Sequence, residues 1–426
     1  MADPRGIWVV VAAILALSPP LRSQTPGPLT LDKCIRLALA APSQVSLAKM
    51  DLEIARKGVT AVRSNFYPTF GIANGYIYNT PQGSAPSFIA LNAPHEYLTQ
   101  AVAAVEVDSS GRLRAAYARA RADQQISQLQ LEIAQRDLKR AVAGAYYRLL
   151  LARHLVTANE EIATEASTFA SRTQKLLAGG EVSRADAVKA EQQLVFQQQA
   201  LAAARLDEKL ANQELASFWT SEVSQPLPIA DSLENPPKPP EPAGTNVAAP
   251  YLRRFEFNLL EAERQGFEAD RRRERAALFP QLTLNYQYGI DASHWSWANR
   301  GSAFYATFNI PVFDFFRARS LADQYRLRAQ QVDATRAITT RNLSREYASA
   351  LDRARLLYEQ IELTRAQVRT SEDNLRLSHI RYDGGEGPAL DVVVAVGQLA
   401  QAQTNYFTLL SNYANALADL EVASGR

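Results

Sequence analysis

The stretch LLAGGEVSRADAVKAEQQL, Leu176–Leu194, recurs without gaps as RYDGGEGPALDVVVAVGQL, Arg381–Leu399. The alignment pairs Gly179 with Gly384, 205 residues later, and keeps the spacing to the next glycine, glutamate and aspartate. Self-similarity at a fixed offset indicates that one structural unit occurs twice in a chain. The sequence therefore predicts a tandem duplication.

A proline-rich seam divides the two copies. Residues 225–250 include NPPKPPEPAG, which is too rich in proline for a helix or a central strand and indicates a linker. The first structural repeat is then predicted at residues 24–224 and the second at 251–426. A further similarity, between NFYPTFGIANGYIYN at residues 65–79 and LFPQLTLNYQYGI at residues 278–290, supports this division.

The N-terminus has the pattern of a secretory signal peptide. One arginine precedes the apolar run IWVVVAAILAL, and SPPLRSQ follows it. This run is shorter than the roughly 20 residues of a transmembrane helix. We expect residues 1–23 to be removed and the mature protein to be exported without a lipid, because its single cysteine, Cys34, lies well inside the mature sequence. One cysteine also excludes an internal disulfide framework.

Two segments almost free of helix breakers predict very long helices. Residues 317–383 contain neither glycine nor proline, and residues 112–178 contain only Gly144. At 1.5 Å per residue such helices extend on the order of 100 Å, which exceeds any globular core, so they must pack as coiled coils. Apolar and small residues at seven-residue spacing support this packing: Leu399, Tyr406, Tyr413 and Leu420, with Ala402, Leu409 and Ala416.

Each repeat also contains a predicted β-hairpin, at about residues 66–107 and 279–313. Within these hairpins apolar and polar residues alternate with a period of two, which indicates strands with one apolar face. The alternating segments are residues 70–78, 97–107, 282–290 and 304–312, the second being the weakest. The aromatic residues gathered there are typical of girdles at a membrane interface. A buried sheet of a soluble domain is the alternative, which the export signal disfavours.

Four strands are too few to close a membrane barrel. The smallest barrels have about eight strands, and open edges in lipid leave backbone groups unpaired at several kcal/mol each. The chain must therefore associate with copies of itself, and the strand count alone permits two or three.

The combination of features resembles the TolC family of bacterial outer-membrane efflux and secretion ducts. The resemblance lies in LTLDKCIRLALAAPSQVSLAK near the start, in SNFYPTF and AALFPQL before the hairpins, and in two G-x5-D-x3-A signatures beginning at Gly180 and Gly385. It implies a mainly α protein with a transmembrane β-barrel part: a homotrimer whose 12-stranded outer-membrane barrel continues into an α-helical periplasmic tunnel. Ala41, where the family commonly has asparagine before Pro42, is a small departure.

The resemblance also implies a function. Such a protein is a passive channel of a tripartite efflux or type I secretion system, located in the cell outer membrane with a large periplasmic part, and it is not an enzyme. Its implied partners are outer-membrane lipid, a periplasmic membrane-fusion adaptor and, through the adaptor, an inner-membrane pump or ABC transporter. The alternative from another class is a periplasmic coiled-coil scaffold without channel activity.

Residues of the two repeated turns are the predicted functional residues. The resemblance implies that the turns form the periplasmic tip that meets the adaptor, through Gly179, Gly180, Glu181, Gly384, Gly385 and Glu386. It places the pore constriction or gate at Asp186, Tyr382 and Asp391. Two departures, Gly387 in place of a latch arginine and Val394 in place of a second ring of aspartates, argue against the family's standard latch.

The two aspartates also have structural interpretations. Ser183 and Asp186 have the spacing of a capping box, whereas Asp391 follows Gly387 and Pro388 at a helix start and is favoured as facing the pore. Three symmetric carboxylates around a narrow axis would repel one another and favour cations.

Other functional classes find no support in the sequence. The net charge of +2 gives no reason to expect nucleic acid as a partner. DGGEGPALD lacks the glycine and lysine spacing of nucleotide loops and the pattern of a calcium loop, so no cofactor is predicted. The four histidines, His95, His154, His294 and His379, show no metal-ligand spacing, so no metal is predicted either. The basic run Arg271–Arg275 indicates a solvated helix face or contact with anionic lipid headgroups.

Overall fold

A computed structural model describes residues 28–78, 94–240 and 249–425. The predicted signal peptide, residues 1–23, and part of the predicted linker lie outside the described residues. The elements are α2 (Leu31–Ala40), α3 (Gln44–Ser64), β1 (Thr69–Tyr78), β2 (His95–Val107), α4 (Arg112–Ala178), α5 (Arg184–Ala216), η1 (Pro250–Arg253), α6 (Phe255–Ala276), β3 (Gln281–Ala292), η2 (Trp297–Asn299), β4 (Arg300–Asn309), α7 (Arg317–Asp383) and α8 (Ala389–Ala423).

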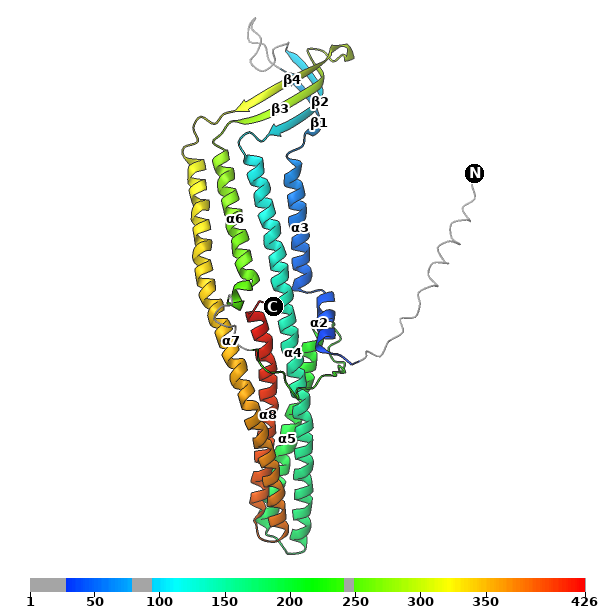
Figure 1. The fold of residues 1–426 in the computed structure, drawn as a ribbon. Coiled ribbons are helices and arrows are strands. Elements are labelled where there is room, and N and C mark those ends of the chain that lie inside the picture. The colour runs from blue at the N-terminus through cyan, green and yellow to red at the C-terminus, as the bar shows by residue number, and fades with distance from the viewer. Residues whose placement is uncertain (1–27, 79–93, 241–248, 426) are drawn as a thin grey trace, which may run out of the picture.

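The molecule is an elongated helical bundle with a β-sheet across one end (Figure 1). The helices α4 and α7, each 67 residues long, run from the sheet to the opposite end. There each turns back through a short loop, α4 into α5 and α7 into α8. Both long helices have the predicted bounds, residues 112–178 and 317–383, so this prediction is confirmed.

The four strands form one antiparallel sheet in the order β1-β2-β3-β4. The predicted alternation is confirmed by the register, because Phe70 lies opposite Ala103, Ala103 opposite Tyr286, and Tyr286 opposite Phe304. One face of the sheet is therefore apolar across all four strands.

The last strand lies earlier in the chain than the predicted segment, residues 304–312, because it begins at Arg300. It ends at Asn309, so Ile310 and Val312 lie beyond it. Pro311 has no N–H to extend the ladder, and the chain then bends into α7 through Phe315 and Phe316, whose φ angles are 53° and 63°. These left-handed conformations of two bulky residues are uncommon.

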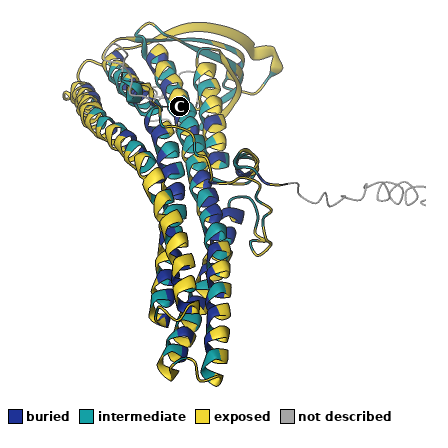
Figure 2. Cartoon of the chain, turned by 60° about the horizontal axis from the view of Figure 1, so that its bottom comes forward, coloured by how far each residue is buried: buried dark blue, intermediate teal, exposed yellow. Residues whose placement is uncertain are grey.

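The predicted coiled-coil seam of α8 is confirmed. Leu399, Tyr413 and Leu420 are buried, as are the three alanine and leucine positions that alternate with them, and Tyr406 is half-buried. Buried residues run as stripes along the helices, shown in dark blue in Figure 2, whereas much of the sheet is exposed. The side chains of α8 pack on both α7 and α4, which joins the two repeats into one body.

The described part of the linker, residues 225–240, contains neither helix nor strand of the main sheet and packs against the middle of the bundle. The hydroxyl of Tyr413 donates to the carbonyl of Pro237 (2.5 Å), and that of Tyr146 donates to the carboxylate of Asp231 (2.6 Å). Cys34 lies beneath this segment, and burial raises the pKa of its thiol to about 11. The described part of the linker is thus packed against the waist of the molecule.

No helix within the described ranges combines the length and apolarity needed to cross a membrane.

Candidate functional site at the helical tip

The two repeated turns have the same backbone structure. In the first turn the N–H of Glu181 donates to the carbonyl of Leu176 (2.9 Å), and that of Gly180 donates to Leu177 (3.0 Å). In the second, Glu386 donates to Arg381 (2.8 Å) and Gly385 to Tyr382 (3.1 Å). Both patterns are Schellman motifs, in which the residue after the helix cap adopts a left-handed conformation.

That left-handed residue is the second glycine of each pair. Gly180 has φ 77° and Gly385 has φ 71°, whereas the preceding glycines have ordinary helical φ angles. All six predicted docking residues are exposed and together form the end of the molecule farthest from the sheet. Their role in docking a partner is a proposal taken up below.

We predict that Gly180→Ala destabilises the first turn by about 1–2 kcal/mol, because an L-residue pays that amount in the left-handed region. Hydrogen exchange of the amides around Glu181 should accelerate accordingly. Gly179→Ala is the matched control, since Gly179 has φ −78° and a helical backbone. If hydrogen exchange accelerates equally in both variants, the effect does not come from the left-handed backbone conformation of Gly180.

Asp186 takes part in capping α5. Its N–H donates to the hydroxyl of Ser183 (3.2 Å), and this hydroxyl donates to the Asp186 carboxylate (2.8 Å). Lys189 lies 3.6 Å from the same carboxylate. The structural interpretation of Asp186 is therefore supported, with the side chain held at the start of its own helix.

Asp391 lies in the first turn of α8 and contacts the preceding helix. Its carboxylate accepts a hydrogen bond from the guanidinium of Arg381 (3.3 Å) and remains more than one-third exposed. The N–H of Gly387 donates to the carbonyl of Arg381 (3.2 Å), so this arginine organises the turn through its backbone and its side chain.

Tyr382 joins the two hairpins. Its side chain is buried, and its ring packs edge-on against Phe169 of α4, with centroids 5.1 Å apart. Its hydroxyl donates a long hydrogen bond, 3.5 Å, to the hydroxyl of Thr173. Of the three predicted gate residues, Tyr382 is the one whose side chain reaches from the second repeat to the first.

An ion pair and a histidine–carboxylate contact that the sequence did not predict also lie at this junction. Arg172 of α4 pairs with Asp383 of α7 (2.6 Å), and the Nε2 atom of His379 lies 2.8 Å from a carboxylate oxygen of Glu165. These partners are more than 200 residues apart, and each is an ordinary surface residue in a helical pattern. No local signal in the sequence marks them.

At the opposite end, the second face of the sheet is polar. Asn285 and Gln287 hydrogen-bond to Thr307 (3.5 Å) and Tyr305 (2.9 Å), and Gln100 donates to Asp291 (3.5 Å). The charged residues on this face of the described strands are Glu96, Glu106 and Asp291. A sheet with one apolar and one neutral-to-acidic face has the pattern of a barrel wall between lipid and water.

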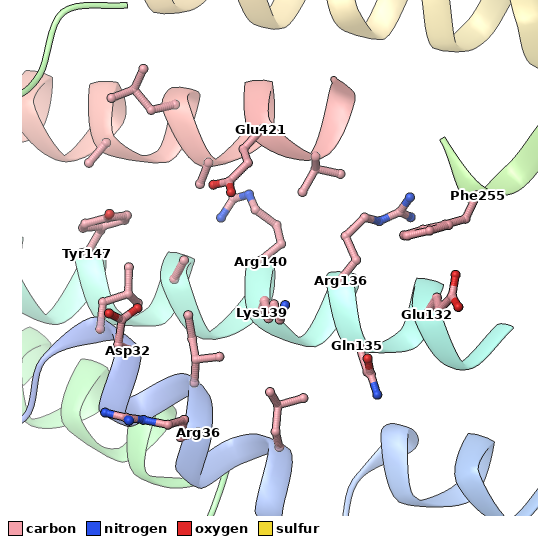
Figure 3. Close-up of a pocket in the computed structure, with 18 residues that line it drawn as sticks. Asp32, Arg36, Glu132, Gln135, Arg136, Lys139, Arg140, Tyr147, Phe255 and Glu421 are labelled. Carbon is pink, nitrogen blue, oxygen red and sulfur yellow. The ribbon is translucent and has the colours of Figure 1, made fainter. Parts of the chain in front are cut away.

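A cleft of about 800 Å³ lies at the waist between α2, α4 and α8 (Figure 3). Its charged lining mixes both signs, as Arg36, Lys139 and Arg140 do with Asp32, Glu132 and Glu421. Among the described residues, no three His, Cys, Asp or Glu side chains gather as a metal site would require.

Comparisons with known proteins agree with this architecture. The family model described as outer membrane efflux protein matches residues 34–220 and 252–426. The cobalt-zinc-cadmium resistance protein CzcC of Cupriavidus metallidurans is 24% identical across 96% of this chain and 93% of its own length.

Solved structures share the fold. The CmeC outer membrane channel of Campylobacter jejuni superposes with a TM-score of 0.82 at 17% identity, covering 93% of this chain and 85% of that one. The open state of the MtrE outer membrane channel of Neisseria gonorrhoeae superposes with a TM-score of 0.79 at 22% identity, covering 93% and 88%.

Proposed function

The chain belongs to the outer membrane efflux protein family, and we propose that it is the outer-membrane duct of a tripartite export system. It conducts substrate passively from a periplasmic adaptor and an inner-membrane transporter to the exterior. The sheet carries this proposal, because its exposed apolar face requires lipid and its polar face suits an aqueous lumen. Members of such a family transport and do not catalyse.

The two edges of the molecule support assembly into a ring. Every residue of β4, and all but one of β1, is exposed, so both edge strands offer unpaired backbone groups. At one edge of the bundle, α7 carries an exposed apolar stripe that includes Leu327, Leu356 and Leu363. At the other edge, α3 exposes Met50 and Ile54. Two different edges of this kind suit a head-to-tail ring.

Three copies are the number that the family resemblance implies. A homotrimer has twelve strands, which exceeds the eight of the smallest barrels. In this ring β1 of one copy pairs with β4 of the next, and the exposed stripes of the helices are covered by the same contact. Closing the ring pairs the backbone N–H and C=O groups of the two edge strands. Each of these groups would cost several kcal/mol if it stayed unpaired in lipid.

The tip supports the proposed docking and gating roles. Four of the six exposed residues of the two turns are glycines, so an adaptor's helical hairpins can approach the backbone there closely. Behind them, Tyr382 and the Arg172–Asp383 pair fasten the second hairpin to the first. We propose that this junction is intact in the closed state of the duct and that the two hairpins separate there when the duct opens. Asp391, held near Arg381, lines the constriction in this proposal, with Asp186 beside it.

Fractionation tests the proposal against the scaffold alternative. The mature protein should appear in the outer-membrane fraction, require detergent for extraction, and have the mass of three chains in detergent. Recovery as a monomer in the soluble periplasm would favour the scaffold.

We propose divalent metal cations as the first cargo class to examine, because CzcC, named for cobalt-zinc-cadmium resistance, aligns over nearly the whole chain. The exposed carboxylate of Asp291 on the polar sheet face accommodates cations. A deletion strain should become more sensitive to zinc, cobalt or cadmium, and the intact gene should restore resistance. If metal resistance is unchanged and the strain becomes more sensitive to drugs, the cargo is drugs. If metal resistance is unchanged and a secreted polypeptide is lost, the cargo is that polypeptide.

A further inference from the structure

The loop between β3 and β4 exposes two large indoles next to an arginine. Trp295 and Trp297 are 61% and 58% exposed, although tryptophan is usually well buried. The loop is held by its own hydrogen bonds, in which the hydroxyl of Ser296 accepts from the N–H of Ala298 (3.3 Å) and Asn299 donates to the carbonyl of His294 (3.5 Å). The indoles are therefore presented on an organised loop.

Arg300 continues this loop into β4 on the apolar face of the sheet. The strand alternates, so Arg300 shares its face with Phe304 and Phe308, which are 69% and 64% exposed. One guanidinium N–H donates to the carbonyl of Trp297 (3.2 Å). A guanidinium has five N–H donors, so this bond ties the group to the backbone of the loop and leaves donors for a further acceptor.

The length of β4 places Arg300 at a membrane boundary. β4 spans Arg300–Asn309 and extends about 30 Å at 3.3 Å per residue, or about 23 Å vertically at a tilt near 40°. The apolar band of such barrels is about 25 Å tall. Beyond one end stand Arg317 and Arg319, both exposed, at the start of α7. Arg300 stands at the other end of β4, which places it at headgroup depth on the side away from the periplasmic helices.

We propose that Trp295, Trp297 and Arg300 form a docking surface for a phosphorylated glycolipid of the outer leaflet. Arginine is suited to bind phosphate through two parallel hydrogen bonds. The apolar C–H face of a sugar ring can stack on an indole. Trp295 and Trp297 lie beyond the level of the acyl chains, where a glycolipid has a sugar ring and a simple phospholipid has none. The surface continues the lipid-facing side of the sheet, and the inference rests on the proposed outer-membrane function.

Lipid titration of the purified oligomer tests this inference. In a Trp219→Phe background the indoles that remain in the mature chain are Trp295 and Trp297, so their fluorescence reports on the loop. Micelles of a bisphosphorylated glycolipid should shift the emission, and the dephosphorylated glycolipid should bind about tenfold more weakly, the loss of one charge-assisted interaction. Arg300→Gln should weaken binding of the phosphorylated form by a similar factor.

Arg317→Gln is the matched control, since Arg317 is an equally exposed arginine at the other boundary of the band. This variant should bind the glycolipid as the parent does. Parent-like affinity of Arg300→Gln, or equal affinity for phosphatidylglycerol, would overturn the proposal. Because the protein is first purified from the outer membrane as an oligomer, failure at that earlier step would count against the proposed function instead.

Discussion

Gly289→Ala should abolish outer-membrane assembly of the protein. A Cβ atom built at Gly289 in β3 would lie 2.0 Å from the carbonyl oxygen of Thr99 and 2.7 Å from the Cα atom of Gln100 in β2. Both are backbone atoms of the paired strand, so neither can rotate away. The ladder between β2 and β3 joins the two repeats within the sheet, and its disruption leaves strand edges that lipid does not tolerate.

Gly301→Ala provides a close control. Gly301 lies opposite Gly289 in the register, on β4, and nothing lies within 4 Å of a Cβ atom built there. The Gly301 variant should appear in the outer membrane at the parent level, whereas the Gly289 variant should be lost from that fraction and degraded. Normal trimer from Gly289→Ala would show that the β2–β3 pairing described here is wrong.

Tyr382→Ala should shift the duct towards the open state. Removing a buried aromatic ring from a packed site costs about 3 kcal/mol or more, and the ring contacts Phe169 across the two hairpins. If this contact exists in the closed state alone, the closed-to-open ratio falls by about 100-fold. Single-channel recordings in planar bilayers should then show longer and larger openings.

Tyr382→Phe separates packing from hydrogen bonding. It keeps the ring and loses the long hydrogen bond to Thr173, so it should conduct nearly as the parent does. The exposed Arg172–Asp383 pair should matter less, since such pairs contribute about 0.2–1 kcal/mol. Arg172→Asp should raise the open fraction slightly, and adding Asp383→Arg should restore it. If single-channel recordings of the Tyr382→Ala variant match those of the parent, Tyr382 is not part of the gate.

The sequence was most informative where local chemistry decides structure. The glycines that flank residues 112–178 marked both ends of α4, and Gly384 marked the end of α7. Alternation along residues 282–290 identified β3 and its apolar face. The repeated glycine pairs predicted two equivalent turns, and these turns share one Schellman geometry.

Contacts that depend on how helices rotate against each other were not predictable. Arg172 and Asp383 meet because α8 sets the spacing of the two hairpins, a property of packing over the whole bundle. The prolines predicted a linker, yet two of its leucines, Leu227 and Leu233, pack on the waist. Composition reports chain stiffness and does not report which surface the chain lies on.

The central claim, that this chain forms a water-filled duct through the outer membrane, is tested most directly by the conductance of the purified wild-type protein in a planar lipid bilayer. The account predicts discrete, uniform steps of ion current from detergent-extracted oligomer, with cations carrying more of the current than anions. Absence of any current from folded, helical protein that is incorporated into the bilayer would contradict the claim and leave the scaffold as the better description.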